Sequence, residues 1–86
     1  MLLEKTKKNI DFYVKHGTRP GIFLYAVLMN SLLDAFRTAD EDNRKHLFDT
    51  YSYIYNKIPA SCYGSRAKVE AWIEMKAAER SRNKQR

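Results

Sequence analysis

Residues 22–36 constrain the fold of this chain more than any other stretch, because only Asn30, Ser31 and Asp34 interrupt fifteen otherwise apolar residues. In a helix, this stretch is apolar around nearly its whole circumference, so it must lie centrally in a domain or face a partner subunit. A proline two residues before it suits the first turn of a helix, where its missing N–H would be unpaired in any case. We therefore predict a central helix over residues 18–38.

Length and composition predict one small folded domain. The chain has 86 residues, 44% of them hydrophobic, with three glycines and two prolines. A domain of this size buries only about 60% of its unfolded surface, which favours self-association. The longest apolar run, residues 22–29, is too short to cross a bilayer, which takes about 20 residues. The first residues lack the apolar core of a signal peptide, and the single cysteine cannot form an internal disulfide. We therefore expect an intracellular, reduced protein without a membrane span, in the cytoplasm.

Three further helices are predicted around the central one. Residues 3–15 place Ile10, Tyr13 and Val14 on one face, and Gly17 is a suitable C-terminal stop. A third helix starts at the cap Asp40. Its inward face carries Leu47, Tyr51, Ile54 and Ile58. A strand over residues 51–55 is an open alternative, because this stretch alternates and contains β-prone residues.

Pro59 ends the third helix, and Ser65 caps a fourth. The inward face of this last helix is predicted to carry Val69, Trp72, Ile73 and Met75. The fold class is therefore all-α, a compact bundle of about four helices over residues 1–75, followed by a basic, frayed C-terminal tail over residues 76–86.

The net charge of +6 is concentrated in that tail. Residues 76–86 contain five cations and one acid, so the tail contributes +4 and the rest of the chain only +2. A solvated terminus is the simpler interpretation. Non-specific, salt-dependent attraction to nucleic acid is the alternative. It depends on the tail, because positive and negative charges nearly balance in the rest of the chain.

No arrangement of residues typical of catalysis or metal binding is present. His16 and His46 are 30 positions apart, and the single pair of His46 with Asp49 is weak as a metal motif. Cys62 has no neighbouring base in sequence. A phosphate-binding P-loop, a dinucleotide fingerprint and a serine elbow are all missing. We expect a protein that is not an enzyme and that needs no metal or cofactor.

Asn30, Asp34 and Arg37 form one polar stripe on the apolar central helix. In one interpretation, Asp34 and Arg37 pair at the helix surface. In the other, Asn30 and Asp34 line a pocket and read the polar edge of a base or ribose. The spacing is compatible with both.

Two predicted helix starts, residues 17–21 and 64–68, share a composition suited to phosphate. Each combines glycine, a hydroxyl, a cation and free backbone N–H groups at the positive end of a helix. Ordinary helix caps look the same. The predicted phosphate ligands are Arg19, Ser65, Arg66 and Lys68. Aromatic residues near both starts, Tyr63 and Tyr25, are suited to stacking on a base.

Five motifs carry a resemblance to a known family. They are YVxHGxxPGxFLxAVL over residues 13–28, ADxxN over 39–43, YNxxP over 55–59, CYGS over 62–65 and VxxWI over 69–73. Together they resemble a widespread family of small uncharacterised proteins carried by bacteriophages and prophages, over roughly residues 10–75. The family usually has tryptophan where this chain has Tyr63, and an acid where it has Ser31.

The resemblance implies a phage protein acting in the host cytoplasm. By analogy with small phage proteins that counter host defence, it suggests a homo-oligomer that sequesters a nucleotide immune signal. In this hypothesis the four predicted ligands bind phosphate, and Tyr63 and Tyr25 stack on the base. Asn30 hydrogen-bonds to the polar edge of the base or ribose. Two alternatives stay open. One is an interaction module that inhibits or adapts a host protein through its apolar helix, and the other is a nucleic-acid binder that uses its basic tail.

Overall fold

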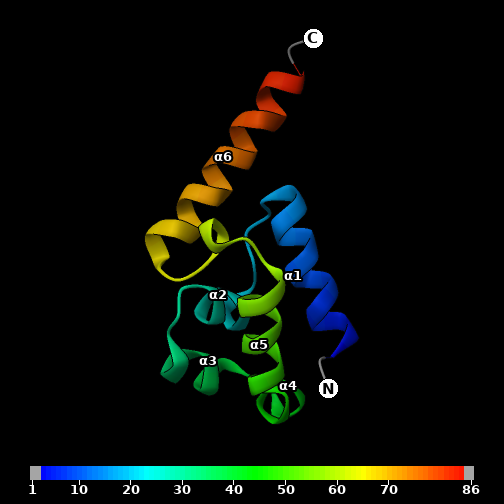
Figure 1. The fold of residues 1–86 in the computed structure, drawn as a ribbon, viewed down its shortest axis with the longest axis vertical. Coiled ribbons are helices and arrows are strands. Elements are labelled where there is room, and N and C mark those ends of the chain that lie inside the picture. Colours follow the sequence, from blue (N-terminus) through cyan, green and yellow to red (C-terminus); the bar gives the residue numbers. More distant parts are fainter. Residues whose placement is uncertain (1–2, 85–86) are drawn as a thin grey trace.

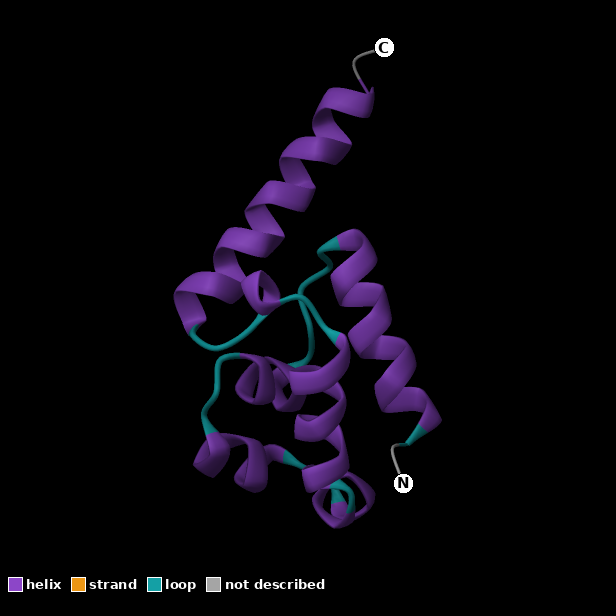
Figure 2. Ribbon diagram, viewed as in Figure 1, coloured by secondary structure: helices purple, strands orange, loops and turns teal. Residues whose placement is uncertain are grey.

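The computed structural model describes residues 3–84, and its regular elements are all helical (Figures 1 and 2). Residues 3–84 contain six α-helices, one 3₁₀ helix and no strand. The helices are α1 (Glu4–His16), α2 (Ile22–Leu28), α3 (Leu32–Thr38), α4 (Glu41–Lys45), α5 (Leu47–Lys57), the 3₁₀ helix η1 (Ala60–Cys62) and α6 (Arg66–Lys84). The all-α prediction is confirmed. The predicted number of about four helices is too low, because two predicted helices are each broken in two.

The first break lies at Asn30, so the prediction of one helix over residues 18–38 is wrong. Asn30 has a φ of +65°, in the left-handed region that asparagine tolerates better than most residues. The N–H of Asn30 donates to the Val27 carbonyl at 3.1 Å, and the N–H of Ser31 donates to the Ala26 carbonyl at 2.9 Å. These two bonds form a Schellman motif, which closes α2 and turns the chain into α3.

The second break lies at His46, between α4 and α5. Its φ of −110° and ψ of 22° are not helical. The predicted cap before α4 is confirmed, since an Asp40 carboxylate oxygen accepts from the Asn43 N–H at 2.8 Å. Residues 51–55 belong to α5, so the strand alternative is wrong.

The core lies where α1, α2, α5 and the start of α6 meet. Its buried residues are Ile10, Tyr13, Leu24, Ala26, Val27, Leu28, Ala35, Ile54, Ile58, Cys62 and Val69. Two side chains tie distant segments together there. The buried Tyr13 hydroxyl donates to the Cys62 carbonyl at 2.8 Å, and the Trp72 indole N–H is shared between the carbonyls of Tyr13 and Val14 at 3.3 and 3.2 Å. Of the inward residues predicted for α6, Met75 is wrong, because it is 41% exposed.

Figure 1 shows α6 running away from the rest of the molecule, so that its C-terminal half projects beyond the other helices. The molecule measures 45 × 24 × 21 Å as a result. Residues 76–84 continue this helix and do not form the predicted frayed tail, and the Arg80 guanidinium donates to the His16 carbonyl at the end of α1. The predicted domain boundary after residue 75 falls inside α6, and residues 85 and 86 of the predicted tail lie outside the described residues.

Candidate functional site

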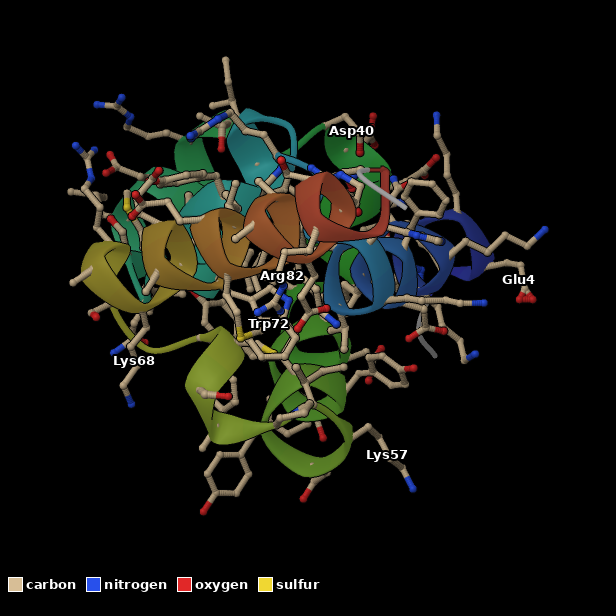
Figure 3. All side chains as sticks on the ribbon, turned by 90° about the horizontal axis from the view of Figure 1, so that it is seen from above. Glu4, Asp40, Lys57, Lys68, Trp72 and Arg82 are labelled. Carbon is tan, nitrogen blue, oxygen red and sulfur yellow. The ribbon has the colours of Figure 1, made fainter. Side chains whose placement is uncertain are left out.

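The chain segment before α6 is held against the end of α2. The Gly64 N–H donates to the Leu28 carbonyl at 2.8 Å, which fixes the position where α6 starts. The predicted cap is present, because the Ser65 hydroxyl oxygen accepts from the Lys68 N–H at 3.2 Å. The Lys68 ammonium folds back toward Gly64 and lies 3.7 Å from the position a Cβ would take there. Figure 3 shows Lys68 at the outer edge of the molecule, next to this helix start.

The two predicted helix starts meet through Arg19 and Glu70. The Arg19 guanidinium donates two hydrogen bonds to the Glu70 carboxylate, at 2.8 and 2.9 Å. The Tyr25 hydroxyl donates to the same carboxylate. The loop before α2 is therefore fastened to the second turn of α6, by contacts between residues at least 45 positions apart.

Tyr25 lies between the cations of both helix starts. The Arg19 and Arg66 guanidinium carbons are each 5.9 Å from the centroid of the Tyr25 ring. This distance is within the range of a cation–π contact. Three of the predicted site residues, Arg19, Tyr25 and Arg66, are thus brought together, and we call them, with Glu70, the arginine cluster.

Charge in the arginine cluster is strongly coupled. The hydrogen bonds from Arg19 and then Tyr25 lower the pKa of Glu70 to about 2, so this carboxylate is ionised at neutral pH. The bond to Glu70 raises the pKa of the Tyr25 phenol, and Tyr25 therefore stays protonated as a donor. The sequence does not indicate a role for Glu70, because nothing in the local spacing connects it to a residue 51 positions away.

A pocket of about 320 Å³ adjoins the arginine cluster between α2, α3 and the first residue of α6. It is lined by Ile22, Tyr25, Ala26, Met29, Asp34, Arg37, Thr38 and Arg66. Asp34 and Arg37 form an ion pair at 3.8 Å beside it, as the first interpretation of the polar stripe expected. We call this the α2–α3 pocket. Its combination of apolar side chains with two guanidinium groups can accommodate a small anionic ligand with an apolar part.

The other two residues predicted to bind the base or ribose, Asn30 and Tyr63, line a different pocket of about 290 Å³. Its remaining lining is Val27, Tyr51, Ile54, Tyr55 and Gly64. The Tyr51 hydroxyl is buried and has no hydrogen-bond partner among residues 3–84, and burial raises the pKa of that phenol. We call this the tyrosine pocket. The predicted base-binding residues are therefore divided, with Tyr25 beside one pocket and Asn30 and Tyr63 beside the other.

Both pockets adjoin the same connection into α6, because Tyr63 and Gly64 line one and Arg66 lines the other. Tyr51 and Tyr55 are one helical turn apart on α5, a spacing that could have signalled a shared aromatic face. The geometry therefore offers guanidinium groups, a helix start and aromatic rings around residues 63–66.

Metal-binding and nucleophilic side chains are not gathered at these pockets. Among residues 3–84 no group of three or more His, Cys, Asp and Glu side chains is close enough to hold a metal ion. Cys62 is fully buried, and this burial raises the pKa of its thiol to about 11. A buried neutral thiol is a poor nucleophile.

Comparison of this chain with models of protein families, with curated proteins and with solved structures finds no match. The geometry of the two pockets is therefore the basis for assigning a function. None of the helices within residues 3–84 has both the length and the apolar character needed to cross a membrane.

Proposed function

We propose that this chain is a small non-enzymatic protein that binds a nucleotide at the start of α6. The observation that carries the proposal is the arginine cluster, in which Arg19 and Arg66, from separate helix starts, both lie 5.9 Å from the Tyr25 ring. Guanidinium groups are well suited to phosphate, and α6 adds the positive end of a helix of 19 residues.

The phosphate ligands in this proposal are Arg66, Ser65 and Lys68 at the helix start, with Arg19 beside them. Arg66 is the central one, because its side chain lines the α2–α3 pocket and, among residues 3–84, forms no ion pair. The base has two candidate positions, against the apolar lining of the α2–α3 pocket or on Tyr63 in the tyrosine pocket. Asn30 supplies amide groups in the second of these.

A homo-oligomer is part of the proposal, and exposed apolar side chains support it. Ile22, Leu33 and Phe48 are 77%, 71% and 82% exposed. Leu32, Phe36 and Tyr55 are also largely exposed. Leu32 and Phe48 line one shallow, mainly apolar pocket, so part of this apolar surface is continuous, as is typical of an interaction surface. In the phage setting, such an oligomer sequesters a nucleotide immune signal in the host cytoplasm.

The test is a thermal-shift screen of the purified protein against cyclic dinucleotides, cyclic trinucleotides, ADP-ribose and inorganic phosphate. A ligand at about 100 times its dissociation constant adds roughly 2.7 kcal/mol to the free energy of unfolding, an easily measured shift. The shift is expected to vanish in Arg66→Ala. It should persist in Arg82→Ala, which removes the same charge from an exposed position farther along α6. No shift with any nucleotide, or equal loss in both variants, contradicts the proposal.

A second candidate is an interaction module that binds a host protein, and the same exposed apolar side chains favour it. In the first candidate a second copy of this chain covers Leu33 and Phe48, whereas in the second candidate a host protein covers them. Analytical ultracentrifugation separates them, since the first requires an oligomer and the second allows a monomer. A monomer that responds to no nucleotide supports the interaction module.

A further inference from the structure

Glu70 is the one carboxylate in the arginine cluster, and it is held by two donors on α2 and the loop before it. Arg19 donates to both of its oxygens, and Tyr25 donates to the oxygen that also accepts from the Arg19 Nη1. Its side chain is nevertheless 35% exposed. Glu70 therefore lies at the surface of the proposed phosphate site, where an incoming anion meets its negative charge.

The charged side chains around the site leave a positive excess, which Glu70 reduces. Three guanidinium groups, those of Arg19, Arg37 and Arg66, are gathered around Tyr25 and the α2–α3 pocket. Two carboxylates oppose them, with Glu70 paired to Arg19 and Asp34 paired to Arg37. Arg66 and Lys68, the remaining cationic phosphate ligands, have no carboxylate paired to them among residues 3–84. Each negative charge of a bound ligand is attracted by these cations and repelled by the Glu70 carboxylate, so Glu70 penalises a doubly charged ligand more than a singly charged one.

We propose that Glu70 is a specificity-determining residue, whose charge shifts the preference of this site away from a doubly charged terminal phosphate and toward a singly charged phosphodiester. The inference rests on the proposed function and names the class of phosphate that the site takes. A carboxylate that stays ionised repels each negative charge of the ligand, and a terminal phosphate carries close to two such charges above its second pKa of about 6. Removing the charge of Glu70 is expected to shift binding toward the terminal phosphate.

The experiment compares two probes that share one base and one sugar. Adenosine 5′-monophosphate carries a terminal phosphate, and its methyl ester is a phosphodiester of nearly the same shape. Binding of each is measured at pH 8 by NMR titration, which detects weak affinities, to the wild type and to Glu70→Gln. The matched control is Glu74→Gln, which removes the same charge one turn farther along α6, where the side chain is exposed.

The ratio compared is the affinity for the methyl ester divided by the affinity for the monophosphate, measured for the same variant. In Glu70→Gln the ratio of the two affinities should fall about tenfold, which corresponds to about 1.4 kcal/mol, and in Glu74→Gln it should stay close to the wild-type ratio. The ion pair of Arg19 and Glu70 is partly exposed on both sides, so the Gln variant is expected to fold. Circular dichroism checks this directly.

Two results overturn the inference while the proposed function stands. One is binding of both probes with an unchanged ratio in Glu70→Gln, and the other is an equal change in Glu74→Gln. If neither the wild type nor Glu70→Gln binds either probe, and the nucleotide screen is also negative, the proposed function and the inference are overturned together.

Discussion

The contact of Gly17 with α6 leads to a quantitative prediction about stability. Gly17 ends α1 with a φ of +67°, and its N–H donates to the Tyr13 carbonyl at 2.7 Å. A Cβ at this position would lie 2.2 Å from the Cβ of Lys76 and 2.6 Å from its Cγ. These atoms are next to the α6 backbone, so they cannot swing away as the end of a long side chain could. Gly17→Ala must therefore strain the backbone and push α1 and α6 apart.

The expected loss has three parts. The left-handed conformation costs a residue with a Cβ about 1–2 kcal/mol. Overpacking between two helices costs a further 1–3 kcal/mol or so. Replacing glycine also reduces the conformational freedom of the unfolded chain, which offsets about 0.4–1 kcal/mol of this loss. The net loss is about 1–5 kcal/mol, a large part of the roughly 4–13 kcal/mol expected for a domain of this size.

The other two glycines provide matched controls. Gly64 has a φ of +117°, but a Cβ there would come no closer than 3.7 Å to Lys68, so Gly64→Ala tests strain without a clash. Its expected loss is about 1–2 kcal/mol. Gly21 would have no atom within 4 Å of a new Cβ and has a φ of −67°, so Gly21→Ala should stay within about 0.5 kcal/mol of the wild type.

Urea unfolding followed by circular dichroism measures all three variants. The free energies of unfolding should fall in the order Gly21→Ala, Gly64→Ala, Gly17→Ala, with the dependence on urea unchanged. The reasoning is refuted if Gly17→Ala loses less than about 1 kcal/mol, or if Gly21→Ala loses as much as Gly17→Ala.

Three further predictions concern single side chains. Tyr13→Phe leaves the carbonyl of the buried Cys62 without its donor, and urea unfolding should show a loss of about 1–3 kcal/mol; a loss below about 0.5 kcal/mol contradicts this role for the hydroxyl. Asp40→Ala removes the cap of α4 and should lower the free energy of unfolding by about 1 kcal/mol, whereas Asp40→Asn, which keeps a capping oxygen, should change it little. Because the folded-state pKa of Glu70 is lowered to about 2, its contribution to stability is present above the ordinary glutamate pKa of about 4.3 and is lost as the pH falls toward 2. The difference in unfolding free energy between the wild type and Glu70→Gln should therefore shrink between about pH 5 and pH 2, and a difference that is constant over this range would show that the ion pair does not contribute.

Features that depend on a few neighbouring residues were predicted correctly. Asp40 and Ser65 cap helices, and Gly17 ends one, because a cap or a left-handed stop is decided within about four residues of chain. The inward faces of α1 and α5 follow the spacing of their apolar residues in the same way.

The breaks at Asn30 and His46 were not predicted. Both residues are tolerated inside helices, so helix propensity alone marks a break at neither position. A turn at Asn30 lets α3 pack against α2. In this turn the N–H groups of Asn30 and Ser31 donate to carbonyls at the end of α2.

The amino-acid sequence was sufficient to indicate an all-helical chain and to single out two helix starts with arginines, hydroxyls and nearby aromatic rings. Only the tertiary structure decided that Arg19 and Arg66 share Tyr25, and that Glu70 joins them, while Asn30 and Tyr63 lie in another pocket. The physical reason is the range of the interactions. Capping and helical periodicity act between neighbours in the chain, whereas the arginine cluster joins residues 45 and 51 positions apart that meet only when α2 packs beside α6.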